Sequence, residues 1–387
     1  MSAPTANWNY PTSIKAGAGR IRELPEHCRA LGMHKPLLVT DPGLASLSIV
    51  TDTLKLCKDA GMECGLFSHI KGNPTGQNVT DGVAAFHDGR HDGVIAFGGG
   101  SALDAAKAIA LMTGQNRPLW DFVDEGDNYL RVNVAGMAPV VAVPTTAGTG
   151  SEVGRASVIV DESTHTKRII FHAHMLPATV ILDPTLTTAL PARLTAATGM
   201  DALSHNLEAL CSPFYHPMAT GIGMEGCHLI HQYLKRAVAD GQDVEARTQM
   251  LVASSMGATA FQKGLGAIHA LAHPLGAVYD AHHGTLCAIL MPYVLKANEK
   301  PITATMAQLA RYLDLPHGSF AALLDWVLGL RDSIHIPHTL REIGIPDDAV
   351  GKIGAMAIRD PSASTNPIPY TAAQYDGILR KAVEGAL

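Results

Sequence analysis

The sequence has 387 residues, more than one compact core usually holds, so two domains are expected. Charged residues make up 17% of it and the net charge is -6, which excludes the strongly basic field that binding to nucleic acid requires. The N-terminus has no basic stretch followed by an apolar one, and no apolar run approaches membrane-spanning length. These features predict a cytoplasmic protein that binds neither nucleic acid nor a membrane.

The six cysteines are scattered along the chain and form no CxxC pair. This spacing favours reduced thiols in a packed interior over a disulfide framework. A bound metal is therefore expected to use histidine and carboxylate ligands.

The first half of the sequence has the pattern of a parallel sheet. β-branched runs at residues 36–41, 92–100 and 138–146 alternate with Ala-rich segments of helical periodicity. Each run ends in Gly, Asp or Thr and leads into a helical segment, and open α/β sheets bind their ligands at such carboxyl ends of strands. A cofactor is therefore expected at this edge of the sheet.

The second half consists of long segments rich in Ala, Leu, Met and His with a 3.6-residue period and hardly any strand pattern. Pro184 and Pro191 flank a Thr-rich connection before the first of these segments, which indicates a domain boundary. We therefore predict an α/β domain over residues 1–190 and a helical domain over residues 191–387. The Pro-rich segment 359–371 is expected to be a surface loop without a chemical role.

A run of three glycines, Gly98 to Gly100, follows the second β-branched run and opens a helical segment. Glycines allow close approach of a ligand, and free amides at a helix N-terminus bind anions such as a pyrophosphate. The alternative is a tight turn in which Ser101 and Asp104 form a capping box. The segment is not a GxGxxG fingerprint, so the pattern leaves both interpretations open.

Two further segments add to the expected cofactor site. The loop at residues 144–152 follows a buried strand and is rich in hydroxyls and glycines, which suits hydrogen bonding to a polar ligand. Asp41 ends the first β-branched run, where a carboxylate can accept from a ribose 2′-hydroxyl and repel a 2′-phosphate, favouring NAD over NADP. The alternative for Asp41 is an ordinary helix N-cap or turn residue.

Histidines and one carboxylate suggest a metal site in the second half. Asp201 and His205 are four residues apart, and so are His269 and His273, which places each pair on one helix face. With His282 and His283, four histidines fall within fifteen positions of otherwise apolar sequence. Unpaired imidazoles would be costly there, so a shared metal ion is the favoured explanation. The spacing does not decide which of the four histidines are ligands.

The motifs GGGSALDAAK, PTTAGTGSE, GMDALSHNLEA, GLGAIHALAHPLGA and HHG occur in the order seen in the iron-dependent, group III, alcohol dehydrogenases. The chain resembles that family from Tyr10, Pro11 and Thr12 through its second half. The resemblance implies an α/β dinucleotide-binding domain, an all-helical metal-binding domain, and the interconversion of a small alcohol with its aldehyde or ketone. It also implies a homodimer or larger homo-oligomer.

The resemblance further implies site residues. Metal ligands would be Asp201, His205, His269 and His283, and His273 would lie near the substrate without binding the metal. Ala281 and His282 stand where many relatives have a proline before the last ligand, so His282 is a competing ligand that we expect to point away. Residues implied for the NAD site are Asp41, Asn73, Gly99, Gly100, Ser101, Asp104, Thr145, Thr146 and Lys167.

A divalent cation in such a site acts as a Lewis acid on the alcohol oxygen, while NAD accepts the hydride. One carboxylate with three imidazoles suits ferrous iron, zinc or cobalt, and the resemblance favours iron. His273 would either relay the hydroxyl proton or only pack beside the ligands.

Arg155 and Lys263 are candidates for binding an anionic substrate tail, which would favour an ω-hydroxy acid such as 4-hydroxybutyrate and its semialdehyde. Alternatively both are solvated charges, and the substrate is a neutral short-chain alcohol or diol. Competing enzyme classes are glycerol dehydrogenase and a lyase like dehydroquinate synthase. The remaining alternative is a silent nucleotide-binding scaffold, which would be expected to lack at least one metal ligand.

Overall fold

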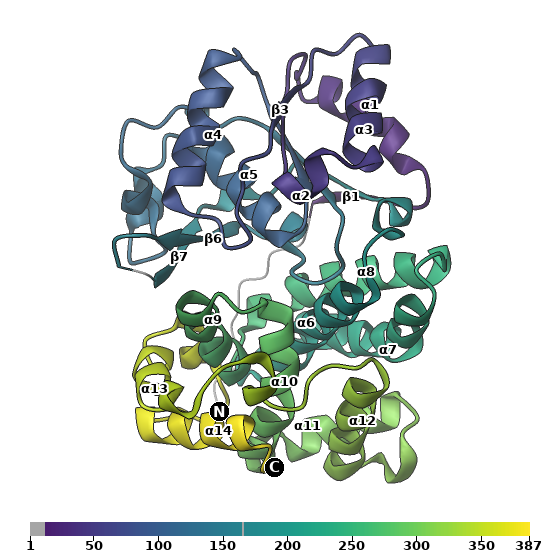
Figure 1. The fold of residues 1–387 in the computed structure, drawn as a ribbon, viewed down its shortest axis with the longest axis vertical. Coiled ribbons are helices and arrows are strands. Elements are labelled where there is room, and N and C mark those ends of the chain that lie inside the picture. The colour runs from purple at the N-terminus through teal and green to yellow at the C-terminus, as the bar shows by residue number, and fades with distance from the viewer. Residues whose placement is uncertain (1–11, 165) are drawn as a thin grey trace. The chain divides into compact units, whose positions relative to one another are not determined.

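A computed structural model describes residues 12–164 and 166–387, so Tyr10 and Pro11 lie outside the described part. The contacts divide the chain into two compact units. The first, here called the sheet unit, comprises Pro11–Thr146 and Gly150–Thr188, and the second, the helical unit, comprises Ala189–Leu387 with the short segment Ala147–Thr149. This division after Thr188 lies two residues before the predicted domain boundary. Figure 1 shows the elements of both units.

The sheet unit is built on six parallel strands in the order β1-β8-β5-β4-β2-β3. The predicted parallel sheet is therefore confirmed. Because all six strands run the same way, the residues that follow β2, β4 and β5 meet at one edge. β6 and β7 form a separate antiparallel pair. The strands are β1 (Ser13–Ala16), β2 (Leu37–Val39), β3 (Gly65–Phe67), β4 (Val94–Gly98), β5 (Val140–Pro144), β6 (Ala156–Asp161), β7 (Thr166–Phe171) and β8 (Thr179–Leu182).

The helices of the sheet unit cover the strands. The most buried of them is α5, whose small Ala side chains let it pack closely on β4 and β5. It begins within the glycine run, at Gly100, so only Gly99 separates the end of β4 from the first turn of α5. The helices are α1 (Leu24–Ala30), α2 (Pro42–Ala45), α3 (Ser48–Asp59), α4 (Gly76–Asp88) and α5 (Gly100–Met112).

The helical unit holds the second core of the molecule. Every residue of Gly199–Leu210 in α6 and of Gly284–Leu295 in α10 is buried, so both helices run through its interior. All strands of the described residues belong to the sheet unit, as the predicted helical second half requires. The helices are α6 (Ala192–Cys211), α7 (Pro217–Ala239), α8 (Val244–Ala260), α9 (Ala267–Tyr279), α10 (His283–Ala297), α11 (Glu299–Tyr312), α12 (Phe320–Ser333), α13 (Lys352–Ala357) and α14 (Ala372–Glu384).

The Pro-rich segment 359–371 differs from its prediction. It contains a 3-10 helix over Pro361–Thr365, and the side chains of Ser362 and Asn366 are buried. Thr365 and Asn366 hold the segment against the start of α9, through hydrogen bonds to Leu265 and Ala267. The expectation of a simple surface loop was therefore wrong for its central part.

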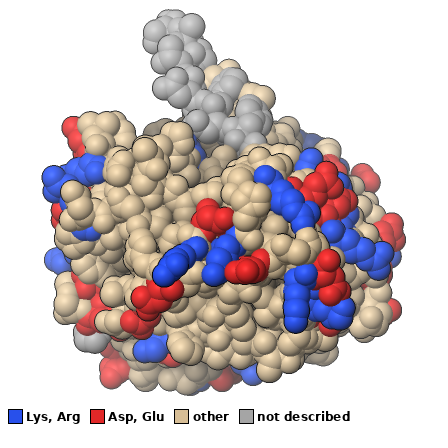
Figure 2. Space-filling model, turned by 90° about the horizontal axis from the view of Figure 1, so that it is seen from above, with Lys and Arg blue, Asp and Glu red and all other residues tan. Residues whose placement is uncertain are grey.

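The surface bears charges of both signs. On the face shown in Figure 2, Lys and Arg side chains are interspersed with Asp and Glu, as the modest net charge suggests. Within the described residues, none of the helices combines the length and the apolar character needed to cross a bilayer.

Candidate metal and cofactor sites

Two of the predicted metal ligands lie in the middle of the buried helix α6. His205 follows Asp201 by four residues, and its Nε2 atom lies 3.9 Å from Oδ1 of Asp201. The other ring nitrogen of His205, Nδ1, contacts the backbone oxygen of Gly148 at 3.2 Å. This contact directs Nε2 toward the carboxylate. Burial lowers the pKa of His205 to about 4, so its imidazole is neutral and able to bind a metal.

The other two predicted ligands approach the same carboxylate oxygen. Nε2 of His269, on α9, lies 4.0 Å from Oδ1 of Asp201, and Nε2 of His283, at the start of α10, lies 3.6 Å from it. The rings of His205 and His269 stack with centroids 4.7 Å apart. Three imidazole nitrogens on three helices therefore surround one carboxylate oxygen.

The residues present fit a divalent cation. Oδ1 of Asp201 and Nε2 of His269 are buried and have no hydrogen-bond partner within the described residues. Buried polar atoms left in this state cost about 1–3 kcal/mol each. One carboxylate and three imidazoles are a common donor set for iron or zinc, and a cation bound among them would satisfy these atoms.

Cys287 also lies at this cluster, and the sequence interpretation missed it. Its Sγ is 3.6 Å from Nε2 of His283, and the ligand atoms of Asp201, His269, His283 and Cys287 all lie within 4.8 Å of one another. The available signal was its position four residues after His283, on the same face of α10. Burial raises the pKa of the Cys287 thiol well above its usual value, which opposes the thiolate form that binds metals.

A second carboxylate, Glu208, forms a hydrogen bond with Nδ1 of His269, the ring nitrogen that does not face Asp201. The Nδ1 atom of His269 donates to Oε2 of Glu208 at 2.7 Å, and the same carboxylate accepts from the backbone amides of Gly266 at 2.9 Å and Ile268 at 2.7 Å. Burial alone would lower the pKa of His269, but the hydrogen bond and charge of Glu208 outweigh it and the pKa is raised. Glu208 therefore fixes both the start of α9 and the ring that it carries.

The remaining two histidines make other contacts. Nδ1 of His273 lies 2.8 Å from Oδ2 of Asp360, and its ring stacks on His283 with centroids 5.4 Å apart. His282 is the N-cap of α10 and accepts from the backbone amide of Thr285 at 3.4 Å. Neither belongs to the group of ligand atoms that lie within 4.8 Å of one another; His205 is also outside that group, although its Nε2 lies 3.9 Å from Oδ1 of Asp201.

In the sheet unit, the start of α5 differs from the capping-box interpretation. The N-cap is Gly99, and no side chain caps the helix. The hydroxyl of Ser101 donates instead to the backbone oxygen of Gly72. Asp104 accepts from the hydroxyl of Ser151 at 2.5 Å and from the amide of Val158 at 3.0 Å. The capping-box interpretation was therefore wrong, and the first amides of α5 remain available to an anion.

The other predicted cofactor residues of the sheet unit lie near this helix start. The amide of Thr145 donates to the oxygen of Gly98 at 2.9 Å, and the Thr146 side chain lies against Gly99. Asp41 follows β2, next to β4 in the sheet, and caps α2 by accepting from the amide of Leu44.

Asn73 and Lys167 lie on neighbouring segments of the same unit. Asn73 follows Gly72, whose oxygen Ser101 contacts. Lys167 pairs with Val160 across β6 and β7, and Val160 in turn forms a bridge with Thr75.

A buried lysine that the sequence interpretation missed supports this region. The Lys107 ammonium donates to the backbone oxygens of Ser151, at 2.9 Å, and Ala156, and lies 3.5 Å from Oδ1 of Asp104. Burial lowers the pKa of Lys107. This side chain ties α5 to the end of the hydroxyl-rich loop and to β6.

The two cations predicted to bind substrate lie in different units. Arg155, half-buried beside β6, places its guanidinium 5.6 Å from the centroid of the Phe171 ring. Lys263 is buried in the 3-10 helix after α8, and its ammonium donates to the backbone oxygen of Leu210 at 3.4 Å. That contact caps the end of α6 and gives Lys263 a role in the fold, while its role in substrate binding stays a prediction.

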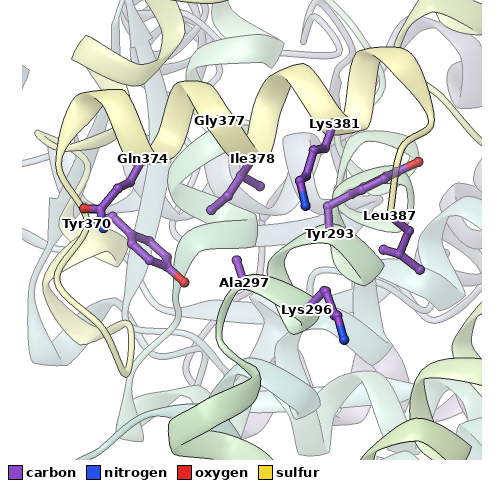
Figure 3. A pocket seen from close by; sticks show the side chains of 9 residues that line it. All are labelled: Tyr293, Lys296, Ala297, Tyr370, Gln374, Gly377, Ile378, Lys381 and Leu387. Atoms are coloured by element: carbon purple, nitrogen blue, oxygen red, sulfur yellow. The ribbon is translucent and has the colours of Figure 1, made fainter.

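A separate groove of about 410 Å³ lies between α10 and α14 (Figure 3). Lys296 and Lys381 lie on its two sides, and the Tyr370 hydroxyl beside it donates to Oδ1 of Asn298 at 2.8 Å. Lys296 is thirteen positions from His283, about 20 Å along α10, and none of the predicted site residues lines the groove.

Comparison with known proteins covers both units. Residues 11–184 match the family model described as iron-containing alcohol dehydrogenase, and residues 195–383 match that of the Fe-containing alcohol dehydrogenase family, C-terminal. A 4-hydroxybutyrate dehydrogenase of Cupriavidus necator is 37% identical over 384 residues, which cover 97% of this chain and 99% of the relative. A 1,3-propanediol dehydrogenase of Klebsiella pneumoniae is 35% identical over 399 residues, which cover 99% of this chain and 100% of the relative.

A crystal structure of a 1,3-propanediol oxidoreductase has the same fold, with a TM-score of 0.91 at 33% identity, covering 97% of this chain and 100% of that one. These matches confirm the resemblance that the five motifs indicated. The chain belongs to the iron-containing alcohol dehydrogenases, and its activity is that of an NAD-dependent, metal-containing alcohol dehydrogenase.

Proposed function

We propose that this dehydrogenase interconverts an ω-hydroxy acid, such as 4-hydroxybutyrate, with its semialdehyde, using ferrous iron and NAD. The observation that carries the chemistry is the approach of three imidazole nitrogens to Oδ1 of Asp201, at 3.6 to 4.0 Å. The similarity to a 4-hydroxybutyrate dehydrogenase, at 37% identity, supports the acid substrate. The alternative is a neutral alcohol or diol, which the similarity to a 1,3-propanediol dehydrogenase supports.

The metal would be held by Asp201, His205, His269 and His283. When bound, the cation lowers the pKa of an alcohol oxygen and NAD takes up the hydride. Asp201 supplies a single negative charge against the divalent cation, because its three neighbours bind as neutral imidazoles. His273, next to these ligands, would accept the hydroxyl proton.

The cofactor would bind at the carboxyl edge of the parallel sheet. The uncapped amides of α5, beginning at Gly100, suit a pyrophosphate, and Gly99 offers no side chain that would block its approach. Asp41 has a second carboxylate oxygen besides the one that caps α2, and that oxygen suits a ribose hydroxyl. The remaining residues of the proposed NAD site are Asn73, Ser101, Asp104, Thr145, Thr146 and Lys167.

Arg155 is the cation that we propose for the carboxylate tail of the substrate, with Lys263 as a weaker candidate. A guanidinium binds a carboxylate through two parallel hydrogen bonds, and the half-buried position of Arg155 would reduce competition from water. Lys263 already donates to the oxygen of Leu210, so a substrate would have to compete for its ammonium.

We also propose a cytoplasmic homodimer or larger homo-oligomer. All six cysteines are free thiols, and four of them are buried, which suits a reducing compartment. Sedimentation velocity of the purified protein would test the assembly, and a single species at 40.8 kDa would contradict it.

The test of substrate class is anaerobic reconstitution of the metal-free protein with ferrous iron or zinc, followed by NADH absorbance with succinate semialdehyde or 3-hydroxypropanal. We expect metal-dependent turnover with a higher kcat/KM for the acid. Arg155→Ala should raise KM for the acid alone, whereas the control Arg168→Ala, which removes a cation paired with Glu125, should leave both substrates unchanged. Equal use of both aldehydes would favour the neutral alternative, and no turnover with any metal would refute the redox function.

A further inference from the structure

The carboxylate of Asp360 is the partner of His273, and neither the metal site nor the cofactor site uses it. Nδ1 of His273 and Oδ2 of Asp360 are 2.8 Å apart, with side-chain exposures of 15% and 11%. The two residues are 87 positions apart in sequence. Asp360 belongs to the Pro-rich segment for which the sequence suggested no chemical role.

The segment that carries Asp360 is held in place. Oδ1 of Asp360 accepts from the amide of Ser362 at 2.9 Å and caps the 3-10 helix that follows. Thr365 donates to the backbone oxygen of Leu265 at 2.7 Å, and Asn366 accepts from the amide of Ala267 at 3.0 Å. Both contacts attach the segment to the start of α9, the helix that carries His273. The carboxylate and the imidazole therefore have fixed relative positions.

An ionised carboxylate only accepts hydrogen bonds, so the ring of His273 must donate its Nδ1 proton to Asp360. In a neutral imidazole this leaves Nε2 as the nitrogen with a free lone pair. The ring is also held by stacking on His283, with an interplanar angle of 12°. Its direction beside the metal ligands is thus set from two sides.

We propose that Asp360 is a positioning residue that fixes the tautomer and the orientation of His273, so that Nε2 accepts the hydroxyl proton of the alcohol. The proposal rests on the proposed dehydrogenase function, in which His273 is the proton acceptor. A carboxylate plays the same part for the base in other enzymes that depend on a directed imidazole.

The variant Asp360→Asn distinguishes the proposed positioning of His273 from the capping of the 3-10 helix by the same carboxylate. Its side-chain oxygen can still accept from the amide of Ser362, so the 3-10 helix keeps its cap. The amide group that replaces Oδ2 is a donor, so Nδ1 of His273 must become the acceptor and the proton moves to Nε2. We expect kcat to fall about 100-fold, the lower range of what a positioned base contributes, with KM and metal content unchanged. The control is Ser364→Ala, on an exposed residue of the same segment.

A double-mutant cycle tests whether Asp360 acts through His273. If it does, Asp360→Asn should have no further effect on kcat once His273→Ala is present. The proposal is overturned if Asp360→Asn lowers kcat as much in that background as in the native chain. It is also overturned if the single variant keeps kcat within threefold of the native enzyme.

Nitrogen-15 NMR of the zinc-loaded, histidine-labelled protein tests the tautomer without any turnover. The resonances of His273 are identified by their loss in His273→Ala. We expect a protonated Nδ1 and an unprotonated Nε2 in the native chain, and the reverse in Asp360→Asn. The same pattern in both proteins would overturn the proposal. If the native enzyme oxidised no alcohol, the proposed function would fail while this measurement still decided the role of Asp360.

Discussion

Replacing Glu208 with glutamine should weaken metal binding, although Glu208 does not belong to the proposed ligand set. The carboxylate accepts three hydrogen bonds, from the amides of Gly266 and Ile268 and from Nδ1 of His269. Glutamine has one acceptor oxygen, which can serve Ile268. Its NH₂ group would then replace Oε2 and face two donors, the amide of Gly266 and Nδ1 of His269.

This clash between hydrogen-bond donors would change the protonation of Nε2 of His269, the atom proposed to bind the metal. To accept a hydrogen bond from the new NH₂ group, His269 must give up the proton on Nδ1 and carry it on Nε2. Nε2 is the atom that faces Asp201 at 4.0 Å, so the protonated nitrogen cannot bind a cation. Loss of such an outer partner lowers metal affinity about 10- to 100-fold, equivalent to about 1.4–2.8 kcal/mol.

The measurement is a competition titration of zinc between the metal-free protein and a chromophoric chelator. Glu245→Gln is the control, because this glutamate is 61% exposed and pairs with Arg236 outside the cluster. The far-UV circular dichroism of each metal-free variant reports whether the fold is intact. Zinc affinity of Glu208→Gln within twofold of the native value, with an intact fold, would refute the role assigned to Glu208.

Three further variants test individual contacts. A Cβ on Gly284 would lie 2.3 Å from a backbone oxygen of α6, so Gly284→Ala should push α10 away from α6. We expect this change to destabilise the fold by about 1–3 kcal/mol in denaturant titrations and to weaken zinc binding. The control Gly329→Ala, which has open space at its Cβ, should have neither effect. Lys107→Met removes the ammonium that donates to buried carbonyl oxygens, so it should lower the free energy of unfolding by about 2 kcal/mol. An unchanged denaturation midpoint would contradict this. Burial raises the pKa of the Cys287 thiol and so opposes its thiolate form. Cys287→Ser should therefore reduce zinc affinity less than His205→Ala, and the reverse order in chelator competition would make Cys287 a ligand.

The sequence predicted those features that depend on short-range periodicity. The β-branched runs before Asp41 and Gly98 gave the parallel sheet, because a strand buried on both faces is apolar without interruption. The i,i+4 spacing brought Asp201 and His205 to one face of α6, because 3.6 residues complete a helical turn. The choice among the later histidines depended on family resemblance, since no spacing relates one helix to another.

The capping-box interpretation of the α5 start failed for a physical reason. Ser101 and Asp104 have the right separation for it, but each side chain has a competing partner from a distant segment. Asp104 accepts from Ser151 and Val158, about fifty positions later, and so joins α5 to β6. A local motif predicts a local hydrogen bond only when tertiary contacts offer no alternative.

The residues that sequence analysis overlooked share this dependence on distant partners. Lys107 contacts Ser151 from 44 positions away, Glu208 contacts His269 from 61, and Asp360 contacts His273 from 87. Each pairs a charged side chain with a buried or partly buried partner, where an unpaired charge would be destabilising. Two of the three partners are histidines of α9, one proposed as a metal ligand and the other as the base. If carboxylates direct both rings, exchanging either for its amide should impair its own histidine alone: Glu208→Gln in metal affinity, and Asp360→Asn in kcat at full metal loading. A variant that impaired both properties would show that the two carboxylates support α9 as a whole rather than its separate rings.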